Sequence, residues 1–62
     1  MEIKIKLVKT RMGGDEVVFE YYSCHVPRIG EKIETPDDYY RVEDVRYIVG
    51  GSRQEVEVKV FN

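Results

Sequence analysis

Apolar and charged residues alternate with a period of two along most of the chain. In residues 2–9, Ile3, Ile5 and Leu7 alternate with charged side chains, and valines do the same in residues 54–61. Successive side chains of a β-strand point to opposite faces, so this period predicts strands with one buried face. No segment shows the 3.6-residue period of an amphipathic helix. The pattern therefore predicts an all-β protein.

The second predicted strand, residues 16–25, has Val17, Phe19 and Tyr21 on the face that we expect to be buried. Its opposite face carries Val18, Glu20, Tyr22 and Cys24. Three of these four side chains are apolar or aromatic, which is too many for a surface that meets only water.

Glycine, proline and aspartate residues separate the predicted strands. Turns are predicted at residues 11–15, 26–31, 35–38 and 50–53. Proline presets φ and glycine adopts positive φ, so both residue types favour turns. A short strand at residues 32–34 is predicted between two of these turns, with Ile33 pointing inward.

The segment of residues 39–49 changes its phase half-way. Tyr40 and Val42 share one face. The apolar residues that follow share the other face: Val45, Tyr47 and Val49. A straight strand would leave one of these two sets in water, so we predict a β-bulge or sharp bend at Glu43–Asp44.

Five strands in 62 residues are too few and too short for an ordinary two-layer sandwich, but they can form one sheet that rolls on itself. A strand that bends and serves two sheets is how small barrels turn corners. We predict a single domain over residues 1–62 that is all-β: a small five-stranded, strongly bent SH3-like barrel. Its first hairpin is expected to be long, and its last strand to pair near the first.

Three segments resemble small SH3-like barrel proteins of phages and bacteria: VPRIGEKI at 26–33, YRVEDV at 40–45 and the closing strand of alternating valines. Those proteins share a Pro-x-x-Gly-acidic turn, a Tyr-x-Val-x-x-Val strand and a terminal hairpin. The resemblance covers residues 26–61 and contains no catalytic residue. It implies a binding module rather than an enzyme and, for a phage protein, a role in binding and modulating a host protein.

Charge and hydropathy limit the expected partners. The net charge is −2, residues 1–14 are basic overall, and residues 15–62 are acidic overall. We therefore expect no tight binding of duplex DNA, which favours a basic face. The chain has no apolar run long enough to span a membrane and no signal-peptide block. A cytoplasmic location is expected (the host cytoplasm for a phage protein), with no membrane partner.

Cys24 is the single cysteine, so an internal disulfide is excluded. Cys24 and His25 are the only soft metal ligands, which is fewer than a structural zinc site needs. We expect a half-buried thiol, a surface imidazole, and no metal or cofactor.

Tyrosine is the residue type in visible excess, with five among 62 residues. The alternation assigns four aromatic residues to the core or its rim: Phe19, Tyr21, Tyr40 and Tyr47. It leaves three outside: Tyr22, Tyr39 and Phe61. These three either shield the ends of a barrel too small to cover its own core or form a recognition surface, since tyrosine combines large area with a hydroxyl group.

Arg41 and Arg46 flank the predicted bulge, and Arg28 lies in the turn before it. Arginine beside exposed aromatic rings binds carboxylates, phosphates or stacked bases. The alternative is that these arginines pair with acidic neighbours at little energetic consequence. Those neighbours are Asp37, Asp38, Glu43 and Asp44. Adjacent carboxylates face opposite ways on a strand, and the Gly-Gly turns lack the helix of a phosphate-binding loop, so we expect no catalytic residue.

Together these patterns predict a non-enzymatic interaction module that binds a protein partner, or a second copy of itself, through a tyrosine-bearing face. The candidate partner-binding residues are Val18, Tyr22, Tyr39, Arg41, Arg46 and Phe61. A homo-oligomer is expected, because the second strand presents an apolar outward face. The alternative is a small binder of single-stranded nucleic acid or a nucleotide, with Tyr22 and Tyr39 stacking on bases and arginines contacting phosphates. Steep weakening by salt would indicate that alternative.

Overall fold

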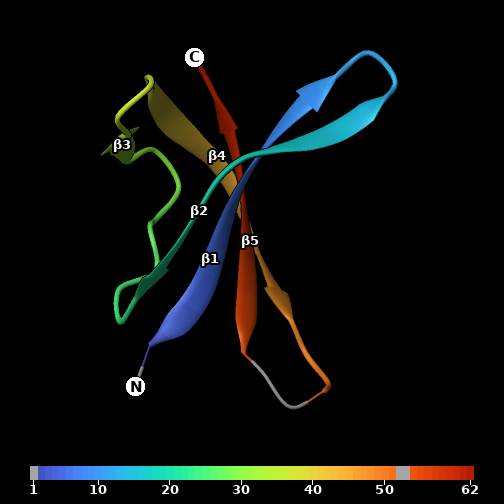
Figure 1. Ribbon diagram of the computed structural model, residues 1–62, viewed down its shortest axis with the longest axis vertical. Helices are drawn as coiled ribbons and strands as arrows, with labels where there is room; N and C mark the ends of the chain where they lie inside the picture. Colours follow the sequence, from blue (N-terminus) through green and yellow to red (C-terminus); the bar gives the residue numbers. More distant parts are fainter. Residues whose placement is uncertain (1, 52–53) are drawn as a thin grey trace.

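The computed structural model describes residues 2–51 and 54–62, and within them the chain forms five strands (Figure 1). They are β1 (Ile3–Arg11), β2 (Gly14–Ser23), β3 (Lys32–Glu34), β4 (Tyr39–Ile48) and β5 (Glu55–Phe61). All five overlap the strands that the period of two predicts. β1 ends two residues later than predicted and β2 begins two residues earlier, so the turn predicted at residues 11–15 is limited to Met12 and Gly13. The predicted turn at residues 50–53 lies in part outside the described residues.

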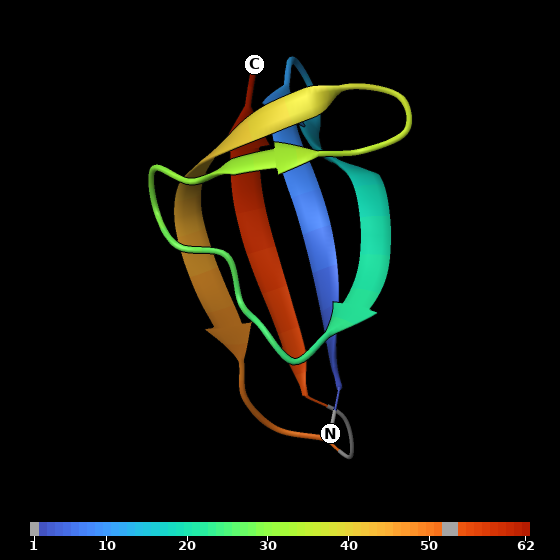
Figure 2. The same cartoon turned by 90° about the vertical axis from the view of Figure 1, so that its left-hand side faces the viewer.

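The strands form one mixed sheet in the order β2-β1-β5-β4-β3. β1 and β2 form a long antiparallel hairpin, as predicted, and β5 returns to pair with β1. The β1–β5 pairing is parallel, whereas β4 is antiparallel to both β5 and β3. β2 and β3 are the two edges of the sheet. The sheet curls into a half-barrel (Figure 2). The prediction of an all-β fold with a small, strongly bent five-stranded barrel is confirmed.

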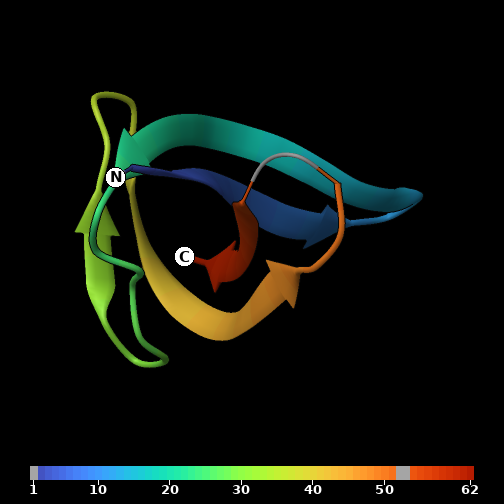
Figure 3. The ribbon, with the colours of Figure 1, turned by 90° about the horizontal axis from the view of Figure 1, so that it is seen from below.

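The bend lies at the predicted place in β4. Val42 pairs with Val60 and Asp44 with Lys59, so Glu43 is an extra residue without its own partner on β5. Val42 and Val45 are three positions apart, so a regular strand would turn them to opposite faces. The bulge lets both face inward. The first half of β4, together with β3, consequently folds over the concave face of the sheet (Figures 2 and 3).

The core lies on this concave face and comes from the three central strands. Its six residues are each at most 2% exposed: Ile5, Leu7, Val42, Val56, Val58 and Val60. Half-buried side chains from the two edge strands, the start of β4 and the loop after β2 close it, among them Phe19, Tyr21, Val26, Ile33 and Tyr40. Desolvation in this layer raises the pKa of the Tyr21 hydroxyl above its usual value.

A second bulge in β2 corrects part of the predicted pattern. Leu7 pairs with Phe19 and Val8 with Val17, which leaves Val18 as the extra residue. Val18 is half-buried against the core rather than outward, and Val17 is exposed rather than buried. Three consecutive apolar residues occupy this site, so the change of phase leaves no sign in the sequence.

The strand ends explain three further differences from the predictions. β2 stops at Ser23, so Cys24 follows the strand and is exposed rather than half-buried. β4 stops at Ile48, so Val49 is 92% exposed instead of pointing inward. Tyr47 lies on the inner side, opposite Val56, but is 63% exposed because it stands at the open end of the half-barrel. The described part of the chain contains no helix with the length and hydropathy of a transmembrane segment.

Candidate binding surfaces

A set of charged side chains on the outer face of the sheet is paired across strands. Lys4 lies near Glu20 and Glu55, Lys6 lies near Glu55, and Arg46 contacts Glu57. We call this set the charged network: Lys4, Lys6, Glu20, Arg46, Glu55 and Glu57. The positive β1 side chains lie between acidic residues of β2 and β5, so the network balances its own charge.

A different surface lies where β3, β4 and the end of β5 meet. Lys32 pairs with Arg41 across β3 and β4, and Arg41 pairs with Phe61 across β4 and β5. Tyr39 lies two residues before Arg41 and therefore on the same side of β4. These four residues line a hollow of about 230 Å³ together with Tyr40 and Asn62. We call it the Tyr39–Phe61 surface: Lys32, Tyr39, Arg41 and Phe61.

Two local structures hold this surface in place. In the loop before β4, the Thr35 hydroxyl donates to the Asp38 carbonyl at 2.7 Å and accepts from the Asp38 amide at 3.1 Å. The Asp38 carboxylate then accepts from the Tyr39 amide and from the side chain of Asn62, each at 2.8 Å. The short polar loop therefore fixes the start of β4 and ties it to the residue after Phe61.

The turn of residues 28–31 supports the Tyr39–Phe61 surface on the side of Arg41. The Glu31 amide donates to the Arg28 carbonyl at 3.0 Å, and Gly30 has a φ of +92°, the geometry of a type II turn. The Gly30 amide donates to the Val42 carbonyl at 2.9 Å, and the Arg41 guanidinium reaches the Gly30 carbonyl at 3.5 Å. Gly30 thus anchors the turn beside Arg41.

The Tyr39–Phe61 surface combines exposed aromatic rings with positive charge. Tyr39 is 56% exposed and Phe61 45% exposed. The Lys32 ammonium lies 4.6 Å from the centre of the Tyr39 ring, a cation–π distance. Among the described residues, neither Lys32 nor Arg41 forms an ion pair. Two cations without a protein counter-ion beside two rings can bind an anionic group with an adjacent apolar one.

The structure brings together only three of the six predicted partner-binding residues: Tyr39, Arg41 and Phe61. Tyr22 is exposed as predicted, but it pairs with Lys4 on the opposite edge of the sheet. Arg46 pairs with Glu57 on the next strand rather than with the acidic residues beside it in sequence. Sequence reasoning missed Lys32, whose place beside Arg41 depends on the pairing of β3 with β4.

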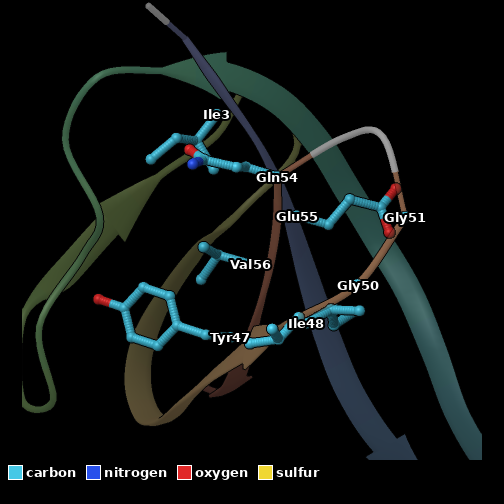
Figure 4. A pocket seen from close by; sticks show the side chains of 9 residues that line it. Ile3, Tyr47, Ile48, Gly50, Gly51, Gln54, Glu55 and Val56 are labelled. Atoms are coloured by element: carbon cyan, nitrogen blue, oxygen red, sulfur yellow. The ribbon is translucent and has the colours of Figure 1, made fainter.

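A second hollow region lies at the open end of the half-barrel. A hollow of about 560 Å³ is bounded by Ile3, Tyr47 and Val56 (Figure 4), and one of about 450 Å³ lies between Val45, Tyr47 and the loop of residues 26–29. Tyr47 belongs to both. We call the two together the Tyr47 groove. Its walls are mainly apolar, with Arg28 in one hollow and Glu55 in the other.

Within the described residues, no three His, Cys, Asp or Glu side chains are grouped so that they could hold a metal ion. No family model matches the chain, and the searches of curated proteins and of solved structures likewise give no match. The resemblance to SH3-like barrels of phages and bacteria therefore stays a prediction.

Proposed function

We propose that this protein is a non-enzymatic interaction module that binds a partner protein through the Tyr39–Phe61 surface. The partner presents an acidic segment with a neighbouring apolar or aromatic side chain. The observation that carries the proposal is the row formed by Lys32, Arg41 and Phe61 across three strands, in which both cations lack an ion-pair partner among the described residues.

Charge complementarity selects the partner. Arg41 presents a planar guanidinium that can bind a carboxylate through two parallel hydrogen bonds, and Lys32 adds a second positive charge. Tyr39 and Phe61 offer apolar area with few rotatable bonds, which is typical of residues that dominate protein interfaces. The elements that hold this surface are strands and hydrogen-bonded turns, so little ordering is needed on binding.

Single-stranded nucleic acid is the alternative partner of the same surface. A base can stack on Tyr39, with phosphates at Lys32 and Arg41. The predicted platform of Tyr22 and Tyr39 is not one surface, however, because the two residues lie on strands at opposite sides of the sheet. The remaining single ring and two cations, in a chain with net charge −2, favour a short acidic segment over a polyanion strand.

Fluorescence anisotropy with a labelled peptide of Glu and Phe residues tests the proposal. The peptide should bind, and Arg41→Gln should weaken binding about tenfold, or about 1.4 kcal/mol. Arg46→Gln is the matched control, because the same change is made to an arginine that already pairs with Glu57. Tyr39→Ala should also weaken binding, since the ring supplies the apolar contact.

Three results would count against the proposal. A peptide in which Gln replaces every Glu should not bind, and equal binding of it would remove the role of charge. An equal loss in the Arg41 and Arg46 variants would place binding elsewhere. Tighter binding of a single-stranded oligonucleotide, with steep dependence on salt, would favour the nucleic-acid alternative.

A further inference from the structure

Lys32 and Arg41 face each other in the closer of the two kinds of pair that antiparallel strands form. The pair one position before them is hydrogen-bonded, because the Val42 amide donates to the Glu31 carbonyl at 2.9 Å. Hydrogen-bonded and non-hydrogen-bonded pairs alternate along an antiparallel ladder, so Lys32 and Arg41 form a non-hydrogen-bonded pair. The Cα atoms of such a pair are about 4.5 Å apart, and its side chains are close neighbours.

Like charges directly opposite each other on two strands are unfavourable unless an anion lies between them. Among the described residues, no carboxylate forms an ion pair with Lys32 or Arg41. The Lys32 ammonium lies over the Tyr39 ring, which stands opposite Glu34, whereas the Arg41 guanidinium reaches the carbonyl of Gly30. The two cationic groups therefore lie towards opposite ends of β3, and both line the same hollow. This arrangement is the one expected of two like charges that lack a shared counter-ion.

We infer that the anionic group bound by this pair is a phosphate monoester on an aromatic ring, carried by a phosphorylated tyrosine of the partner protein. The inference rests on the proposed function and specifies the ligand of the same surface. A phosphate monoester carries about −1.5 to −2 charges at neutral pH and three acceptor oxygens, so one group can bind both cations. A single carboxylate balances one cation and leaves the other without a counter-ion.

The groups around the pair fit both parts of this ligand. A guanidinium binds two phosphate oxygens through parallel hydrogen bonds, and an ammonium binds phosphate as a point charge. The single contact of Arg41 with the Gly30 carbonyl leaves its other donors available. Phe61 stands opposite Arg41 on β5 and is 45% exposed, so it offers an apolar surface to the ring that carries the phosphate.

Fluorescence anisotropy with labelled peptides that differ at one position tests the inference. The peptide with phosphotyrosine should bind about tenfold more tightly than the peptide with sulfotyrosine, because the sulfate has the same tetrahedral shape but a smaller negative charge. The peptide with phosphoserine should bind more weakly than the one with phosphotyrosine, because phosphoserine has no ring to pack against Phe61.

Three variants assign the preference to the pair of cations. Lys32→Gln should remove most of the difference between phosphotyrosine and sulfotyrosine, because one cation is then left. Lys6→Gln is the matched control, since the same change is made to a lysine that lies near Glu55, and the difference should stay. Glu34 lies two positions after Lys32 on the same side of β3, so Glu34→Gln should strengthen phosphate binding. Circular dichroism would show that each variant keeps the β-sheet spectrum of the wild type.

The inference and the proposed function can fail separately. Binding of the peptide of Glu and Phe residues without any preference for phosphotyrosine over sulfotyrosine would overturn the inference alone, and so would a preference that survives Lys32→Gln. Binding of the phosphotyrosine peptide alone would support the inference and narrow the acidic segment to a phosphorylated one. No binding of any of these peptides would overturn both. Tighter binding of a nucleoside monophosphate than of the phosphotyrosine peptide would overturn the inference in favour of a nucleotide.

Discussion

The outer surface of the sheet carries charge in two different ways. In the charged network, Lys4 has Tyr22 on one side and Glu55 on the other, and it lies near two carboxylates. At the Tyr39–Phe61 surface, Arg41 has Lys32 on one side and Phe61 on the other. The strand register thus places opposite charges near each other in the charged network. Beside Arg41 it places a second cation, Lys32, and the ring of Phe61.

One surface of a single sheet thus carries both a charge-balanced region and the region through which we propose that the protein binds a partner. Exposed ion pairs contribute little free energy, but each charge in them is balanced by a neighbour of the same chain. The charge of a cation whose cross-strand neighbours are a second cation and a phenyl ring is not balanced in this way. The position on β3, an edge strand, leaves Lys32 with one neighbouring strand instead of two.

The largest expected effect comes from removing the support that both regions share. Val58 is fully buried on β5, between Leu7 and Val45. Val58→Asp would bury an unpaired charge, at a cost that exceeds the ~5 kcal/mol of stability that a small domain has. Circular dichroism should show an unfolded chain, whereas Val49→Asp, at an exposed position, should stay folded. A folded Val58→Asp protein would contradict the assigned core.

A smaller effect is expected at the turn beside Arg41. Gly30 has a φ of +92° with nothing within 4 Å of an added Cβ, so Gly30→Ala strains the backbone without a clash. The expected loss is about 1–2 kcal/mol in the free energy of unfolding, measured by urea denaturation. A D-alanine at position 30, introduced by chemical synthesis, adopts positive φ and should restore stability. Equal losses for both alanines would contradict the turn geometry.

The smallest effect separates the two kinds of arginine. A double-mutant cycle on Arg46 and Glu57 should give a coupling of about 0.2–1 kcal/mol that decreases as salt is added. Arg41→Ala should change the free energy of unfolding by less, while it weakens binding of the acidic peptide. A coupling of zero for Arg46 and Glu57, with a large loss in Arg41→Ala, would reverse the comparison.

The candidate surfaces were only partly predictable from the sequence. The alternation correctly places Tyr39 and Phe61 on the outside, and the sequence indicates Arg41 as a candidate binding residue. The alternation cannot show that Arg46 forms an ion pair and Arg41 does not, because both are outward residues near the bulge. The partner of each is set by the neighbouring strand, and Glu57 is 11 residues from Arg46 in the chain.

The sequence by itself determined the strands to within two residues at their ends, the turns among the described residues and the bend of β4. Each of these follows from local patterns: a period of two, residues that favour turns, and apolar residues that change phase around Glu43. The tertiary structure alone decided the bulge at Val18, the parallel pairing of β1 with β5, and the row of Lys32, Arg41 and Phe61. These depend on register between segments far apart in the chain, and register is fixed by packing of the whole core rather than by any one segment.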